Sequence, residues 1–216
     1  MDFLRGIIIK GKPKMNVEVL SYTPDPELLI ANCASTCYDS KPKELDKARK
    51  MIAAIIKSHH DSCIEVCTVT FRLSNISRTV THELVRHRIG FSYQQRSQRY
   101  VDEKIPSFVT PKEIAENPEA LVVYNKCMAK CWESYSRLQE LGLEKQIARY
   151  VLPNSCCTEI CVTANFRAWR NFLKLRLSKR AQPEIRELSK IILEKLIEIA
   201  PSCFEDLKDE SNLQNT

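Results

Sequence analysis

The spacing of hydrophobic and polar residues along the chain predicts an alternation of strands and helices. Apolar residues occupy every second position in residues 15–22, and again in residues 65–73, where Val69 and Phe71 share one face. Alternation of this kind is typical of a strand with one buried face. Residues 156–164, with the sequence CCTEICVTA, predict a third strand.

Helical periodicity accounts for most of the remaining chain. The predicted helices are 25–38, 43–59, 78–88, 117–142, 165–180 and 183–199. We expect Ser77 to cap the helix over 78–88 and Gly90 to end it. The residues that follow, up to Tyr100, are expected to form a loop.

Three helix starts carry a specific sequence signal. A capping residue precedes proline at Asp25-Pro26 and at Asn117-Pro118, and proline suits the first turn of a helix. Thr110-Pro111-Lys112-Glu113 has the form of a capping box, which predicts a further short helix.

Because strands and helices interleave, we expect one domain of the α/β or α+β class, with a central, mostly antiparallel or mixed sheet flanked by helices. The chain has 216 residues, which suits a single core. We expect this domain to span residues 1–204 and an acidic, frayed tail to follow at 205–216. The chain has only four glycines, and no two lie close enough for a glycine-rich phosphate loop, which excludes a Rossmann fold.

The ten cysteines are numerous for this length. The sequence shows neither a signal peptide nor an apolar run of the roughly 20 residues that span a membrane. We therefore expect a cytoplasmic protein with no membrane contact and with reduced thiols. Four cysteine pairs have three residues between them, but this spacing is not typical of zinc sites. We expect no metal and interpret the cysteines as small buried hydrophobic residues.

Positive charge is concentrated in two segments, although the whole chain carries only +6. Residues 72–100 contain six arginines, no lysine and one acidic residue, Glu83. Residues 164–186 contain five arginines and two lysines against Glu184. Clustered arginine favours bidentate capture of phosphate or carboxylate, so we expect both segments to contribute to one anionic ligand site.

One arginine lies where a charge is unexpected. In the helix over 165–180, Trp169 and Phe172 belong to an apolar stripe, and Arg176 and Asn165 fall on the same stripe. A guanidinium on a buried face needs a partner, because an unpaired buried charge is very costly. The partner can be an internal acidic residue, or it can be a bound anion or a polarised ligand carbonyl.

Four motifs resemble those of the flavin-dependent thymidylate synthases. The signature of that family, RHR followed by seven or eight residues and serine, is similar to RHRIGFSYQQRSQRY at 86–100. The family's other motifs resemble HDSCIE at 60–65, ARYVLP at 148–153 and the block at 165–186. The resemblance covers roughly residues 15–200, with all four motifs in order.

The resemblance implies a methyltransferase that converts dUMP to dTMP by reductive methylation. Methylenetetrahydrofolate would supply the carbon, FAD would supply the hydride, and NADPH would reduce the flavin. Members of this family are homotetramers whose sites combine several subunits. The resemblance therefore also implies dUMP and folate as ligands and further copies of this chain as partners.

The resemblance also assigns roles to individual residues. Those expected to contact FAD are Ser62, Arg86, His87, Arg88, Gln95, Asn165, Arg167 and Asn171. Those expected to bind dUMP are Glu83, Arg86, Gln95, Arg96, Ser97, Gln98, Arg99, Arg149 and Arg176. Arg176 would be catalytic, because a cation beside the uracil ring favours its ionised form. Ser97 lacks a recognisable base, so we expect it to position the nucleotide and not to act as a nucleophile.

Four positions depart from the commoner residues of the family. Gln95 stands where many members have glutamate, and Gln94 where many have asparagine. Val66 stands where histidine is frequent, and Glu83 where glutamine is frequent. Glutamine retains a hydrogen-bond acceptor but not the charge, so nucleotide specificity is expected to persist while the pH dependence differs.

Two other classes of function compete with an enzyme. The basic helix over 78–88 resembles a recognition helix, which would indicate a nucleic-acid-binding module. The low net charge and the acidic flanks argue against it, and we expect no nucleic acid to bind. The chain would otherwise be a regulatory protein that binds nucleotide without catalysis. A yellow purified protein would favour the enzyme over both.

Overall fold

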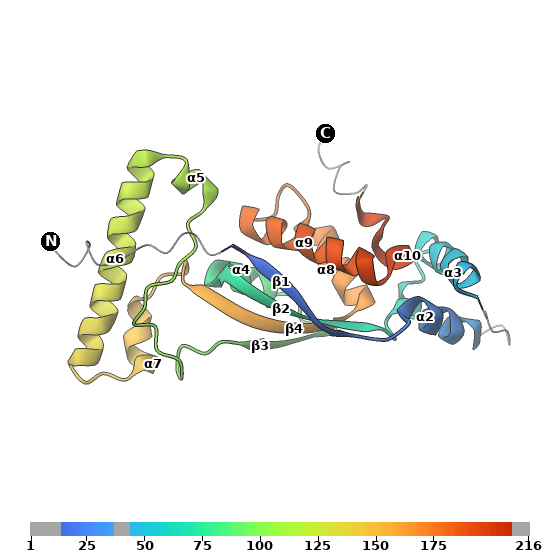
Figure 1. Ribbon diagram of the computed structural model, residues 1–216, viewed down its shortest axis with the longest axis horizontal. Helices are drawn as coiled ribbons and strands as arrows, with labels where there is room; N and C mark the ends of the chain where they lie inside the picture. Colours follow the sequence, from blue (N-terminus) through green and yellow to red (C-terminus); the bar gives the residue numbers. More distant parts are fainter. Residues whose placement is uncertain (1–13, 37–43, 209–216) are drawn as a thin grey trace. The chain divides into compact units, whose positions relative to one another are not determined.

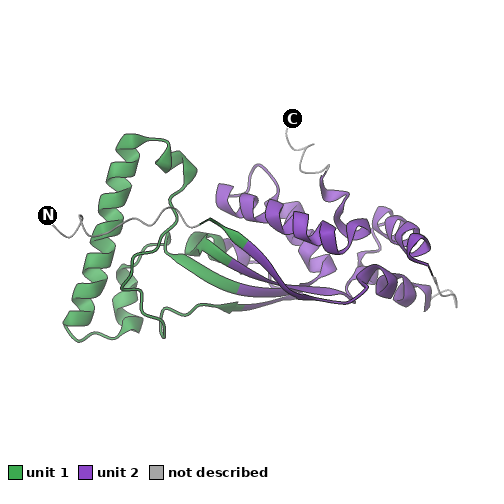
Figure 2. Ribbon diagram, viewed as in Figure 1, with its two compact units in different colours: residues 1–16, 74–82, 94–160 green, residues 17–73, 83–93, 161–216 purple. Residues whose placement is uncertain are grey.

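The computed structural model describes residues 14–36 and 44–208, and these fall into two compact units (Figure 2). Unit 1 contains residues 74–82 and 94–160 together with the segment before residue 17. Unit 2 contains residues 17–73, 83–93 and 161–216. Each unit is described separately below.

Four strands within the described residues form one sheet. They are β1 (Asn16–Tyr22), β2 (Thr68–Ser77), β3 (Phe91–Gln95) and β4 (Cys157–Asn165), in the order β1-β2-β4-β3. Thr70 Oγ1 lies 2.9 Å from Thr163 Oγ1, and Ser74 donates to Glu159 at 3.3 Å. Residue numbers that rise along β2 thus meet falling numbers along β4, which makes this pair antiparallel. The prediction of three strands is confirmed, and the class is α+β.

The strand β3 was not predicted, because its residues were expected to form a loop. Phe91 and Tyr93 are half-buried while Ser92 and Gln94 are exposed, so this segment has the alternation of an edge strand. Just beyond it, the Arg96 N–H donates to the Glu159 carbonyl at 2.9 Å. The segment contains several polar residues, which conceals the alternation in the sequence.

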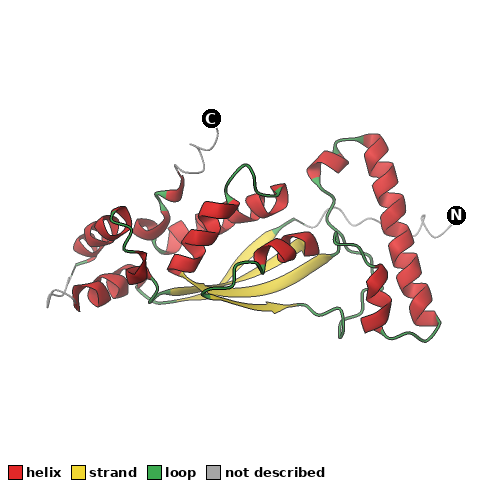
Figure 3. Cartoon of the chain, turned by 180° about the vertical axis from the view of Figure 1, so that it is seen from behind, coloured by secondary structure: helices red, strands yellow, loops and turns green. Residues whose placement is uncertain are grey.

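Unit 2 contains most of the hydrophobic core. Its helical elements are α2 (Pro26–Ser35), α3 (Leu45–Lys57), η2 (Asp61–Ile64), α8 (Phe166–Arg176), α9 (Pro183–Ile199) and α10 (Pro201–Phe204). Helices α8 and α9 lie over one face of the strands (Figures 1 and 3). Trp169 of α8 packs edge-on against Phe71 of β2, with ring centroids 5.2 Å apart, and its indole donates to the Val69 carbonyl. The predicted apolar stripe of this helix is therefore confirmed as its buried face.

Unit 1 contains the long helix α6 (Pro118–Glu140) and three short elements, α5 (Lys112–Ala115), α7 (Lys145–Ala148) and η3 (Arg149–Val151). The Asn117 side chain accepts a hydrogen bond from the Ala120 N–H at 3.1 Å, which confirms the predicted cap of α6. Met128 and Trp132 pack with Cys156 in a small core of this unit.

Several predicted helix ends differ from the structure. Asp25 precedes α2 in a left-handed conformation and makes no side-chain cap, and Pro111, not Thr110, precedes α5. Helix α4 (Arg78–Leu84) starts as predicted, since Ser77 Oγ accepts from the Val80 N–H at 3.2 Å. The predicted end of α2 near Tyr38 lies outside the described residues.

Helix α4 ends four residues before the predicted position. The Tyr93 hydroxyl reaches the carbonyl oxygens of Leu84 at 2.9 Å and His87 at 2.5 Å. Its one O–H can donate to only one of them at a time, and the Leu84 carbonyl is one that a helix continued to residue 88 would use internally. Residues 85–88 therefore form a turn, and the Arg86-His87-Arg88 motif lies on this turn instead of the helix.

The C-terminal end of the described chain is anchored within unit 2. Leu207 is fully buried, and Asp206 forms an ion pair with buried Arg170 at 2.6 Å. Residues 209–216 of the expected tail lie outside the described residues. Over the part of the chain that the structure describes, no helix is both long and apolar enough to cross a membrane.

Gly90 and Gly142 form a matched pair for testing the turn after α4. Both have positive φ, +77° and +86°, but an added Cβ at Gly90 would lie 3.0 Å from Ala168 Cβ, whereas nothing lies within 4 Å at Gly142. We expect Gly142→Ala to lower the free energy of unfolding by about 1 kcal/mol and Gly90→Ala by about 2–4 kcal/mol. Urea unfolding measures both values, and equal losses would contradict the close approach of this turn to α8.

Candidate functional site

Arg176, at the end of α8, is held by two residues of α4 and the turn that follows it. Its Nε–H donates to His87 Nε2 at 2.9 Å. Its Nη1 lies 2.5 Å from a carboxylate oxygen of Glu83, and its Nη2 donates to the Glu83 carbonyl at 3.1 Å. The partner of the stripe arginine is thus internal in this structure, which was one of the two alternatives left open by the sequence.

His87 is the central buried polar group of this site, with 8% of its surface exposed. Its ring packs edge-on against Phe172 at 5.0 Å and lies 5.9 Å from Phe91. Burial lowers the pKa of His87 to about 4, and the positive charge of Arg176 acts in the same direction while Glu83 opposes it. The imidazole is therefore neutral at pH 7, with Nε2 as the acceptor and the proton on Nδ1.

The two arginines beside His87 have a different environment. Arg86 and Arg88 are exposed, and no hydrogen bond or ion pair from either guanidinium to another described residue is found. Surface arginines on a rigid turn keep their donors available for an anionic ligand. The turn thus directs one side chain into the core and leaves two cations at the surface of unit 2.

Ser62 and Arg167, two of the residues expected to contact FAD, line one cavity of about 610 Å³ in unit 2. Arg167 forms an ion pair with Glu65 at 2.5 Å, and both side chains are about half exposed. His59 and His60 also line this cavity. The structure thus places Ser62 and Arg167 at one cavity.

The two asparagines of the C-terminal motif differ from each other. Asn165 Oδ1 accepts from the Ala168 N–H at 2.8 Å and caps α8. It was expected on the apolar stripe, but a capping residue lies outside the helical repeat, so only its Nδ2 donor can face a ligand. Asn171 is exposed on α8.

The donors of unit 2 suit a flavin dinucleotide. Its pyrophosphate is anionic, and its ring system presents carbonyl and nitrogen acceptors. Arg86, Arg88 and Arg167 supply cations, and Ser62 and Asn171 supply neutral donors. The residues present therefore fit the group that the motifs imply.

Most residues expected to bind dUMP lie in unit 1, where Gln95 and Arg96 are held by neighbours. Gln95 Nε2 donates to Thr81 at 3.1 Å and to Thr158 at 3.3 Å. Arg96 lies 3.5 Å from Glu103, whose pKa is raised by burial although Arg96 opposes this. Both side chains are therefore preorganised by unit 1 itself.

The residues after Arg96 present unused donors. Ser97 Oγ accepts from the Arg99 N–H at 3.2 Å, and the Arg99 guanidinium lies over the Tyr100 ring. Gln98 is 6% exposed and interacts with the Cys156 thiol, but its Nε2 donates to no nitrogen or oxygen acceptor among the described residues. Because sulfur is a weak acceptor, an oxygen acceptor of a ligand at this point would stabilise the buried amide. Arg149 of η3 is half-buried in the same unit.

The motifs missed Arg78. Its Nη2 donates to the Arg96 carbonyl at 3.0 Å, and its buried Nε lacks a partner among the described residues. Burial lowers the pKa of Arg78, and the neighbouring charges of Arg149 and Arg96 add to this while Glu103 opposes it. The signal available in the sequence was the concentration of arginine in residues 72–100, to which Arg78 belongs.

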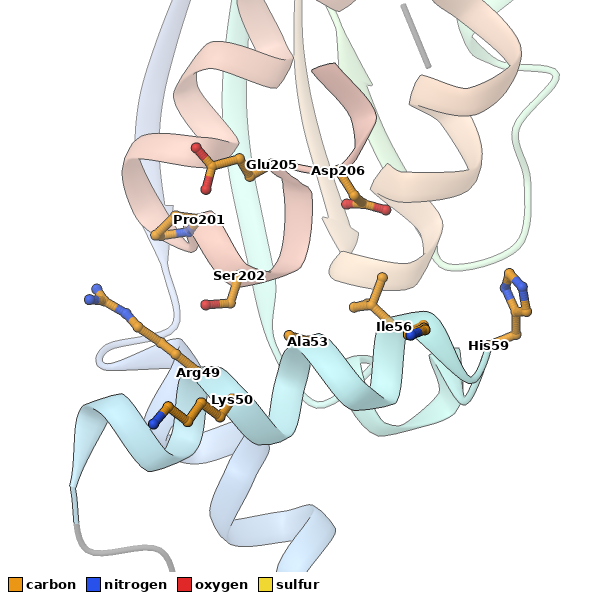
Figure 4. Close-up of a pocket in the computed structure, with 10 residues that line it drawn as sticks. Arg49, Lys50, Ala53, Ile56, His59, Pro201, Ser202, Glu205 and Asp206 are labelled. Carbon is orange, nitrogen blue, oxygen red and sulfur yellow. The ribbon is translucent and has the colours of Figure 1, made fainter. Parts of the chain in front are cut away.

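A second cavity in unit 2, of about 730 Å³, lies between α3 and α10 and contains none of the predicted site residues (Figure 4). Its lining includes Arg49 and Lys50 of α3, and Ser202 and Glu205 on the opposite side. Arg49 is already paired with buried Glu27 at 2.8 Å. The Glu27 carboxylate also accepts from the Ser202 N–H at 2.9 Å, so the Arg49–Glu27 pair joins α2, α3 and α10.

The cysteines do not form a metal site within the described chain. No group of three or more histidine, cysteine, aspartate or glutamate residues that could hold a metal ion occurs among residues 14–36 and 44–208. Burial raises the pKa of Cys67 to about 11 and that of Cys156 to about 12, and it also raises the pKa of Cys203. These thiols are protonated and unreactive at neutral pH.

Comparisons with known proteins agree with the motifs. The family model described as "Thymidylate synthase complementing protein" matches residues 18–202. A "Flavin-dependent thymidylate synthase" from Geobacter sulfurreducens is 37% identical over 203 residues, covering 89% of this chain and 86% of its own. A protein of the same name from Clostridium tetani is 34% identical over 221 residues, covering 91% of this chain and 88% of its own.

Solved structures support the fold. A "UMP/dUMP methylase PolB" from Streptomyces cacaoi, bound with 5-Br dUMP, superimposes with a TM-score of 0.80 at 21% identity. The match covers 91% of this chain and 95% of the other. At this identity the likeness establishes the α+β architecture.

The burial of the thiols predicts a clear order of chemical modification. Cys33 and Cys127 are exposed, whereas Cys67 and Cys156 are buried. We expect iodoacetamide at pH 7.5 to label Cys33 and Cys127 at least about 100-fold faster than Cys67. Burial raises the pKa of Cys67 to about 11, which lowers its thiolate fraction, and it also keeps the reagent from reaching the sulfur. Peptide mass mapping follows each site, and urea-unfolded protein serves as the control. Equal labelling of native Cys67 and Cys33 would contradict the core described here.

Proposed function

The chain belongs to the thymidylate synthase complementing protein family, and on this premise we propose that it methylates dUMP to dTMP. Its relatives are named flavin-dependent thymidylate synthases, and this makes the chain a methyl-transferring enzyme that uses a flavin. The finer proposal assigns methylenetetrahydrofolate as the carbon donor and NADPH as the reductant.

The observation that carries this proposal is the setting of Arg176. Its contacts with Glu83 and His87 use three of the five N–H donors of a guanidinium. The remaining two, one on each Nη, are the groups that we propose face the uracil ring. Because the side chain is only 17% exposed, its charge is less screened there than at the surface.

Arg176 acts on the acidity of the ring in this proposal. Loss of the N3 proton leaves an imide anion, and a fixed guanidinium beside it lowers the free energy of that anion. The electron-rich ring then forms a bond from C5 to the methylene carbon of the folate, and one bond of that carbon to a folate nitrogen breaks. C5 gives up its proton and N3 regains one. A hydride delivered to the carbon would complete the methyl group of dTMP as the second carbon–nitrogen bond breaks, and the two folate nitrogens take up the proton lost by C5 and one from solvent, which leaves tetrahydrofolate.

The residues of unit 2 hold the cofactor in this proposal. Ser62, Arg86, Arg88, Arg167 and Asn171 would bind FAD, with further contacts from Asn165, His87 and Gln95. When bound, reduced FAD would supply the hydride, and NADPH is the reductant that we propose for it. The exposed guanidinium groups neutralise the pyrophosphate, which would otherwise oppose binding of a second anion, dUMP.

The residues of unit 1 hold the nucleotide in this proposal. Arg96, Arg99 and Arg149 provide cations for a phosphate dianion, and Gln95 and Gln98 provide amide groups. Ser97 positions the nucleotide through its hydroxyl group. No acceptor on a side chain that could activate Ser97 is hydrogen-bonded to its Oγ among the described residues, which supports a binding role.

We also propose that the active enzyme is a homotetramer. Val122 and Val123 of α6 expose 52% and 68% of their surface, and Leu141 exposes 62%. Further copies of the chain would cover this apolar surface of unit 1.

Substitution of Arg176 tests the proposed chemistry. We expect the purified protein to be yellow, or to take up FAD with absorbance near about 450 nm, and to form dTMP from dUMP. Arg176→Ala is expected to lower kcat by at least about 1,000-fold while FAD still binds, because one charged contact made in the transition state contributes roughly that factor. Chromatographic detection of dTMP measures kcat.

Arg180→Ala is the matched control, because it removes an exposed arginine four residues further along the chain and should leave kcat within about threefold. Unchanged turnover in Arg176→Ala would remove Arg176 from the chemistry. A colourless protein that does not bind FAD and that retards DNA in a gel mobility assay at moderate salt would contradict the enzyme proposal.

A further inference from the structure

We propose that His87 is a positioning residue that holds Arg176 through its ring nitrogen, in addition to any contact it makes with the flavin. The inference rests on the proposed function, in which Arg176 is the catalytic cation. The motif alone places His87 beside the cofactor with its two arginine neighbours. The geometry separates His87 from them, because its side chain points inward and theirs do not.

The hydrogen bond from Arg176 uses the single acceptor of the imidazole. A neutral histidine has one acceptor nitrogen and one N–H donor. Nε2 of His87 accepts from Arg176 Nε at 2.9 Å, so only Nδ1–H is left for another partner. The Nε–H of an arginine lies at the base of its planar fork, and a bond there fixes the direction in which both Nη groups point.

Both the ring and the main chain of His87 are held in place by neighbouring residues. Its ring packs against both Phe172 of α8 and Phe91 of β3, and its carbonyl oxygen accepts from the Tyr93 hydroxyl. A side chain with so little freedom loses little entropy when it holds a second group in place. His87 therefore provides a rigid support for Arg176.

The charges that face the ring require it to remain neutral. Arg176 comes from α8 and Glu83 from α4, while β3 contributes Phe91 and the uncharged Tyr93. A protonated imidazole would have no acceptor and would place a second cation at hydrogen-bond distance from the guanidinium. The single carboxylate of Glu83 is already bonded to Arg176, so it cannot offset both charges.

Two substitutions at His87 distinguish positioning from flavin binding. Glutamine places its amide oxygen as many bonds from Cβ as Nε2 is, so His87→Gln keeps an acceptor for Arg176, whereas His87→Leu removes it. We expect His87→Leu to lower kcat by about 10–100-fold, the worth of one hydrogen bond to a charged group, with flavin Kd and the KM for dUMP within about threefold. His87→Gln should retain kcat within about fivefold.

His82→Leu is the matched control, because it makes the same change at an exposed histidine of α4 and should leave kcat unchanged. All variants are compared at saturating FAD after circular dichroism has established that they are folded. If His87→Leu raises the flavin Kd tenfold or more and saturating FAD restores its kcat, the proposal is overturned. Equal loss of kcat in the glutamine and leucine variants would overturn it as well.

A double-mutant cycle keeps this test separate from the proposed function. His87→Leu, Arg176→Ala and the double variant are unfolded in urea, and their equilibrium constants are compared with that of the unaltered chain. We expect the folding equilibrium constant of the double variant to be about 10-fold larger than the value obtained by multiplying the effects of the two single substitutions. Independent effects would show that the two side chains are not coupled, whether or not the protein forms dTMP. If the two side chains are coupled but the protein forms no dTMP, the positioning of Arg176 by His87 is supported and the proposed reaction is rejected.

Discussion

The structure of unit 2 depends on the cost of leaving a guanidinium unpaired on the apolar face of α8. Arg176 follows the buried residues Phe172 and Leu173 on that face, so it cannot reach water freely. The fold meets this cost with Glu83 and His87, which come from a segment about 90 residues away in the sequence. A charge that is fixed and partly dry is also what a reaction through an anionic ring requires.

This requirement explains the form of the turn after α4. For His87 to face Arg176, the helix has to end before it, and the Tyr93 hydroxyl lies within hydrogen-bond distance of the carbonyl oxygens of Leu84 and His87 and can donate to one of them. The same turn brings Gly90 against Ala168, where a side chain would not fit. His87 then points inward to Arg176 while Arg86 and Arg88 stay outside, so a single tripeptide holds the arginine that we propose to be catalytic and presents two cations at the surface of unit 2.

Sequence reasoning recovered the elements with strong periodicity and failed where a tertiary contact decides the outcome. The strands at 68–77 and 157–165 and the helices α6 and α9 follow from alternation, capping residues and proline. The early end of α4 depends on Tyr93, and β3 depends on pairing with β4, so neither is visible in local sequence. Arg176 was recognised as anomalous from its stripe alone. That its partners would be Glu83 and His87, and that Arg78 would join Arg96, required the fold.

The central claim is that His87 is neutral and accepts a hydrogen bond from Arg176. A nuclear magnetic resonance titration of the His87 ring nitrogens, assigned with the His87→Gln variant, measures this directly. The account predicts a single Nδ1–H tautomer at pH 7 and a pKa near about 4, below the ordinary value of 6.5. A pKa at or above 6.5, or a proton on Nε2, would contradict it.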